Sequence, residues 1–126
     1  MSVLLDTQAF LWWISDHPKL SRRAQAVIAD EHCFLSIASC WEMAIKVSLG
    51  KLEMPRPLQR FLQEQLEING FALLPVSLEQ AAAVSAFPVH HRDPFDRLLA
   101  AQALDEEIPV VSSDPVFKAY GVKRIW

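Results

Sequence analysis

Four acidic residues lie far apart in this sequence, each at the end of an apolar run or in the early turns of a predicted helix. They are Asp6, Glu42, Asp96 and Asp114. In an open sheet of parallel strands, ligands bind beyond the carboxyl ends of the strands, so acids placed there converge. Converging carboxylates repel one another unless they are protonated or bridged by a cation, and Mg²⁺ and Mn²⁺ prefer oxygen ligands. The pattern therefore predicts a metal-dependent enzyme.

The elements that must position these acids alternate between strands and helices. Apolar runs predict strands at residues 2–5, 33–35, 71–76, 110–111 and 123–126. Helical spacing of apolar residues, with proline or glycine at the ends, predicts helices at 7–15, after Pro18, at 38–49, after Pro57, at 78–86, from Asp93 onward and at 115–120. This order predicts a single α/β domain over residues 1–126, a three-layer α/β/α sandwich around a mostly parallel central sheet.

Composition limits the function classes. A chain of 126 residues, 52% hydrophobic and 21% charged, is expected to form one globular core that needs no disulfide or structural metal. The apolar block from Ala9 to Ile14 is far shorter than the roughly 20 residues of a membrane span, and Asp6 interrupts any signal-like segment. Cys33 and Cys40 lack zinc-site spacing and are too few for a disulfide framework, which favours reduced core cysteines in the cytoplasm.

The net charge of −3 excludes a strongly basic nucleic-acid binder, but it does not exclude nucleic acid. An acidic pocket that holds divalent ions presents positive charge to phosphates. The basic residues that could frame such a groove, or could equally be solvated surface charges, are Lys46, Lys51, Arg56, Arg92 and Arg97. Lys46 also follows Glu42 by four residues, the spacing of a helix-surface salt bridge.

Each acid alone also has a purely structural interpretation. Asp6 and Asp114 fit helix N-caps. Glu42 follows Ser39 by three residues, as in a capping box, and Asp96 could support its helix N-terminus through the helix dipole. The prediction of a site therefore rests on all four acids standing at the same end of the layered fold.

Four segments of the chain resemble the motif blocks of PIN domains, and most of all those of the VapC-type toxins of type II toxin–antitoxin pairs. They are 4–13 (LLDTQAFLWW), 36–46 (SIASCWEMAIK), 91–103 (HRDPFDRLLAAQA) and 112–114 (SSD). The resemblance runs from Val3 to Trp126. Two positions depart from the usual pattern, Gln8 for His or Asn and Ser112 for Thr, and neither removes a carboxylate.

The resemblance implies a metal-dependent endoribonuclease that cuts single-stranded RNA or tRNA to leave a 5′-phosphate and a 3′-hydroxyl. It implies that Asp6, Glu42, Asp96 and Asp114 are the catalytic and metal-binding acids for Mg²⁺ or Mn²⁺. We expect Asp6 and Asp96 to hold the principal ion, with Ser112 orienting the last acid. The resemblance also implies a separate antitoxin protein as partner, a homodimer, and a prokaryotic cytoplasmic location without membrane attachment.

Several alternatives stay open at this stage. His90 and His91 are metal or acid–base candidates but sit in a Pro-containing loop, which favours plain surface positions. Arg97 fits a phosphate contact or a pair with Glu106 or Asp93. The aromatic residues Trp12, Trp13 and Phe61 fit either core packing or the apolar groove that similar toxins use for an antitoxin segment.

Two other classes of function compete with a nuclease. A receiver-type signalling domain would phosphorylate one Asp and would need Lys118 or Lys123 late in the chain, neither of which clearly follows a strand. A binding module that lost catalysis is disfavoured because all four acids are present. With only Gly50, Gly70 and Gly121, the chain has no P-loop and no dinucleotide fingerprint.

Overall fold

The computed structural model describes residues 1–89 and 93–126. Its five strands form one sheet in the order β3-β2-β1-β4-β5, and every strand pair is parallel. The strands are β1 (Ser2–Leu5), β2 (His32–Ser36), β3 (Ala72–Leu74), β4 (Val110–Val111) and β5 (Arg124–Ile125). The predicted α/β fold with a mostly parallel sheet is confirmed.

The described helices connect these strands in the predicted order. They are α1 (Thr7–Ile14), α2 (Arg22–Asp30), α3 (Ile37–Ser48), α4 (Leu58–Asn69), α5 (Leu78–Ala83), the 3₁₀ turn η1 (Val84–Ala86), α6 (Pro94–Glu106) and α7 (Val116–Ala119). The helix expected at 78–86 is therefore an α-helix that tightens into a 3₁₀ turn, and the strand expected at 71–76 pairs only over its middle. None of the described helices is long and apolar enough to span a membrane.

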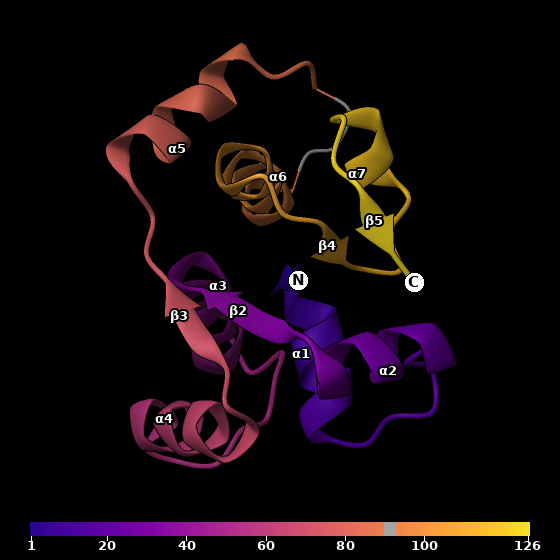
Figure 1. The fold of residues 1–126 in the computed structure, drawn as a ribbon. Coiled ribbons are helices and arrows are strands. Elements are labelled where there is room, and N and C mark those ends of the chain that lie inside the picture. Colours follow the sequence, from indigo (N-terminus) through magenta and orange to yellow (C-terminus); the bar gives the residue numbers. More distant parts are fainter. Residues whose placement is uncertain (90–92) are drawn as a thin grey trace.

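Helices cover both faces of the sheet (Figure 1), with α1, α2 and α4 on one side and α6 and α7 on the other. Side chains of β1 alternate between the two resulting cores: Val3 and Leu5 face the first and Leu4 faces the second. All three are fully buried. A strand buried on both faces is apolar at every position, which explains why this segment shows no polar alternation.

At the carboxyl edge of the sheet, helices begin directly after the strands β1 and β2 end. Asp6 follows β1 directly and is the N-cap of α1, and its side chain accepts a hydrogen bond from the Ala9 amide at 2.7 Å. Ser36 ends β2 and is the N-cap of α3. Because β1 and β2 are parallel neighbours, both helices begin side by side at this edge.

A buried polar network fixes α6 against the rest of the fold. Gln102 of α6 is fully buried; its Oε1 accepts a hydrogen bond from the Ser36 hydroxyl at 2.5 Å. Its Nε2 donates to the carbonyl of Pro75 and to Gln80 Oε1, each at 3.2 Å. Buried amides are costly unless satisfied, so this network ties α6 to the start of α3 and to α5.

Candidate active site

The four predicted acids line one cleft of about 220 Å³ at the carboxyl edge of the sheet. The residues that line it are Asp6, Thr7, Gln8, Leu11, Glu42, Lys46, Asp93, Asp96, Ser113 and Asp114. Residues separated by more than a hundred positions in sequence thus face the same space. The structure brings together all four acids that the sequence singled out.

Asp6 is almost as deeply buried as Glu42, with 6% of its surface exposed. The pKa of Asp6 is raised to about 6, chiefly by burial and to a smaller extent by the charges of Asp114 and Glu42. Hydrogen bonds from the Ser112 side chain and the Ala9 backbone act in the opposite direction but do not cancel the effect of burial. Asp6 is therefore the N-cap of α1, and its ionised form is disfavoured when no cation is near.

Asp96 lies in the first turn of α6, but it is not the N-cap of that helix. That role belongs to Asp93, whose side chain accepts a hydrogen bond from the Phe95 amide at 2.9 Å. The pKa of Asp96 is raised to about 7, most of all by burial and then by repulsion from the acids Asp93, Asp6, Glu42 and Asp114. A carboxyl group whose pKa is raised this far by burial and by four neighbouring acids stands in a site suited to a cation.

Glu42 is held by two donors in the second turn of α3. The Thr7 hydroxyl donates to Oε1 at 2.7 Å, and the Lys46 ammonium donates to Oε2 at 2.7 Å. The capping-box interpretation with Ser39 is wrong, because α3 begins earlier than expected and Ser36 is its N-cap, accepting from the Ala38 amide at 3.0 Å. Ser39 is instead buried, 2.9 Å from the Thr7 hydroxyl.

Asp114 is oriented by the segment that follows β4. The Ser112 hydroxyl accepts a hydrogen bond from the Asp114 amide at 3.0 Å, and Asp114 Oδ1 accepts one from the Val116 amide at 3.0 Å. Since the Ser112 side chain also hydrogen bonds to Asp6, it links the first and last acids of the site. Arg124 braces the same segment by donating to the carbonyl of Ser112 at 3.1 Å.

A family model for the PIN domain matches residues 3–123, almost the whole chain. The chain belongs to the PIN domain family. Ribonuclease VapC22 of Mycobacterium tuberculosis is a relative, 31% identical over 117 residues that cover 90% of this chain and 87% of the relative. The family resemblance expected from the four motif blocks is thereby confirmed.

Solved structures share the PIN fold with this chain. VapBC2 from Rickettsia felis, bound to a DNA fragment from its promoter, aligns with a TM-score of 0.67 at 16% identity, covering 98% of this chain and 97% of that one. FitAcB from Neisseria gonorrhoeae aligns with a TM-score of 0.67 at 21% identity, covering 97% and 95%. At these identities the alignments establish the fold.

The donor set of this PIN site fits a divalent metal ion. As the side chains stand, the described residues contain no group of three or more carboxylate, histidine or cysteine side chains close enough to hold an ion between them. The carboxylates are nevertheless near enough to raise the pKa values of Asp6 and Asp96, and oxygen is the donor that Mg²⁺ and Mn²⁺ prefer. A bound cation would offset the repulsion that contributes to both raised pKa values.

The structure also places the other sequence candidates. Arg97 contacts neither Glu106 nor Asp93 among its described hydrogen bonds; its Nη2 donates to the carbonyls of Val84 and Phe87 at 3.2 and 3.4 Å. Among the described basic residues that the sequence offered as candidates, those that do not line the cleft are Lys51, Arg56, Arg97, Lys118 and Lys123. His90, His91 and Arg92 lie outside the described residues.

Thr7 is a residue of the site that was not predicted from the sequence. The signal available was its place directly after Asp6, at the carboxyl end of an inner strand, where side chains face a ligand site. Its role became visible only because α1 and α3 pack together and bring Thr7 within hydrogen-bonding distance of Glu42, 35 positions away.

Proposed function

We propose that this PIN domain protein is a Mg²⁺- or Mn²⁺-dependent endoribonuclease that cleaves single-stranded RNA and acts as the toxin of a toxin–antitoxin pair in a prokaryotic cytoplasm. The observation that carries the proposal is the convergence of Asp6, Glu42, Asp96 and Asp114 on one cleft, with the pKa values of Asp6 and Asp96 raised. The relationship to a protein named as a ribonuclease supports RNA as the substrate.

Within this proposal, Asp6 and Asp96 are the main ligands of the ion, and Asp114 completes the acidic wall. When bound, a divalent ion would supply charge stabilisation at the phosphoryl group and a water of lowered pKa. Ser112 keeps Asp6 and Asp114 in a fixed relation through hydrogen bonds to both. Thr7 fixes Glu42, so the acids are held in place before substrate arrives.

Cleavage of a labelled single-stranded RNA by the pure protein tests the proposal. We expect cutting with Mg²⁺ or Mn²⁺, none with EDTA, and a loss of at least about a hundredfold for Asp6→Asn, as when a group that stabilises the transition state is removed. The products should carry a 5′-phosphate and a 3′-hydroxyl. Absence of cutting across a varied RNA pool, with the protein folded and free of partner, would favour the non-catalytic binding module.

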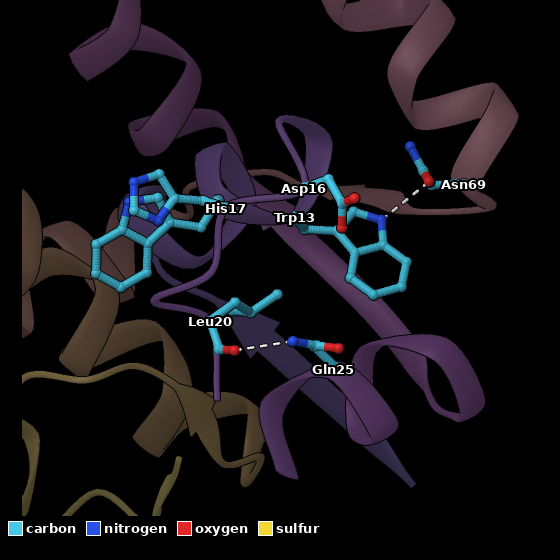
Figure 2. Close-up of a pocket in the computed structure, with 7 residues that line it drawn as sticks. Trp13, Asp16, His17, Leu20, Gln25 and Asn69 are labelled. Atoms are coloured by element: carbon cyan, nitrogen blue, oxygen red, sulfur yellow. Dashed lines mark hydrogen bonds between the residues drawn. The ribbon is translucent and has the colours of Figure 1, made fainter. Parts of the chain in front are cut away.

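Two hollows on the α1 side of the sheet support an antitoxin partner. One hollow of about 270 Å³ is lined by Trp12, Trp13, His17 and Asn69 among others, and Figure 2 shows the Trp13 indole pointing toward Asn69, to which Nε1 donates at 2.9 Å. A second hollow of about 280 Å³ between α1 and α4 includes Phe61. The structural neighbours that are toxin–antitoxin complexes support this assignment.

Light scattering tests the partner and the homodimer together. Co-expressed with the protein encoded beside it, the chain should elute as a stable complex, and Phe61→Asp should weaken that complex at least tenfold because it places a charge in an apolar hollow. Glu64→Gln, on the exposed side of α4, is the matched control. Alone, the chain should show twice its 14.3 kDa mass; a monomer that binds no neighbour protein would contradict both assignments.

A further inference from the structure

Lys46 is the only basic residue among the described residues that line the acidic cleft, where it stands among five carboxylates. It projects from α3 one turn after Glu42. Its side chain is 46% exposed, whereas that of Glu42 is 7% exposed. The Lys46 side chain is therefore partly exposed where it lines the cleft, whereas its carboxylate partner is buried.

The hydrogen bonds of Glu42 explain why Lys46 stays at this position. One oxygen of Glu42 accepts from Thr7 and the other from Lys46, each at 2.7 Å. Thr7 anchors the carboxylate from α1, so the ammonium is bound to a fixed point rather than to a mobile side chain. An ammonium has three donors, and the described contacts use one of them. Lys46 can thus hold Glu42 and a further acceptor at the same time.

We propose that Lys46 is a substrate-binding residue that donates to a non-bridging phosphate oxygen of the RNA strand, and that Glu42 is the residue that positions it. A polyanion that enters this cleft meets five carboxylates, and a compact ammonium is a group that binds phosphate as a point charge. A partly exposed pair at i and i+4 adds little to helix stability, so it is free to serve binding instead. This inference rests on the proposed ribonuclease function.

Salt dependence of RNA binding tests the assignment directly. An oligoribonucleotide is titrated by fluorescence anisotropy over a range of KCl at constant Mg²⁺, with Asp6→Asn as the parent so that the RNA stays intact. Adding Lys46→Gln should weaken binding about three- to tenfold and reduce the slope of log K against log salt by about 0.7, the value for one phosphate contact on a single strand. Lys46→Arg should keep the slope, since it keeps the charge.

Lys123→Gln is the matched control, because Lys123 lines a different hollow, beside Pro109 and Gly121 at the opposite edge of the sheet. It should leave the slope unchanged. If Lys46 only holds Glu42 for the metal site, Lys46→Gln will change Mg²⁺ affinity by calorimetry without changing the slope, and the inference is overturned. Thermal melts of each variant identify a change that comes from unfolding.

The outcomes separate this inference from the function on which it rests. Wild-type protein that cleaves RNA, together with a Lys46→Gln variant that keeps both its KM and its salt slope, would overturn the role of Lys46 alone. Wild-type protein that neither cleaves nor binds RNA would overturn the proposed function and this inference with it.

Discussion

Asp96→Asn is expected to abolish RNA cleavage and, at the same time, to stabilise the metal-free protein at about pH 8. The folded state raises the pKa of Asp96 from 3.8 to about 7, so ionising this group costs more in the folded than in the unfolded chain. Three pKa units correspond to about 4 kcal/mol, which solvent screening of this partly exposed group reduces to about 1–2 kcal/mol. Removing the charge should recover that amount.

The measurement is a pair of melting curves in EDTA beside a cleavage assay. The melting temperature should rise by about 4–8 °C, since 1 kcal/mol shifts the melting temperature of a domain of this size by about 4 °C. Activity should fall at least about a hundredfold. Glu64→Gln removes the same charge from the exposed side of α4 and should change neither quantity. A variant that is less stable than wild type would instead support the helix-dipole interpretation of Asp96.

Metal-free wild-type protein should lose stability as the pH rises from about 4 to about 7, opposite to the usual behaviour of carboxylates. The folded-state pKa values of Asp6 and Asp96 are about 6 and about 7, against an ordinary aspartate pKa of 3.8. Between these values the folded state binds more protons than the unfolded state, so the free energy of unfolding falls with pH. Below about pH 4 the penalty vanishes, and above about pH 7 it is constant.

Urea unfolding across this pH range, with EDTA or with Mg²⁺, measures the effect. We expect the free energy of unfolding in EDTA to fall by about 2–4 kcal/mol, allowing for screening and for the coupling of the two groups. Mg²⁺ should restore it near pH 8 and have little effect near pH 5, because metal ligands must be deprotonated. Stability in EDTA that stays flat with pH would mean that neither burial nor the neighbouring acids disfavour the two anions.

Much of the fold was already determined by local sequence. The apolar segment at 3–5 predicted an inner strand, and it is fully buried between the two cores. Asp93 followed by Pro94 predicted the start of α6, and Asp93 does cap it. Both features depend on neighbours in the chain, which is why sequence alone was enough. The convergence of the four acids followed in turn from the rule that parallel strands share a carboxyl edge.

The long-range partners of the site residues were decided by tertiary structure. Glu42 lies four residues before Lys46, the spacing of a salt bridge, and this pair forms. The other oxygen of Glu42 accepts a hydrogen bond from Thr7, and no local sequence pattern connects these two residues. Arg97 could have paired with an acid by spacing, yet packing of α6 turns it toward the carbonyls of Val84 and Phe87.

The raised pKa values of the acids also come from the tertiary structure. Asp6 and Asp96 have ordinary carboxyl groups in the sequence, and only burial together with other acids raises their pKa values. Solvation and charge repulsion depend on distances between atoms of different elements. The sequence therefore determined which residues reach the cleft. Packing decided which of them are held by hydrogen bonds and which have a raised pKa because their ionised form is disfavoured.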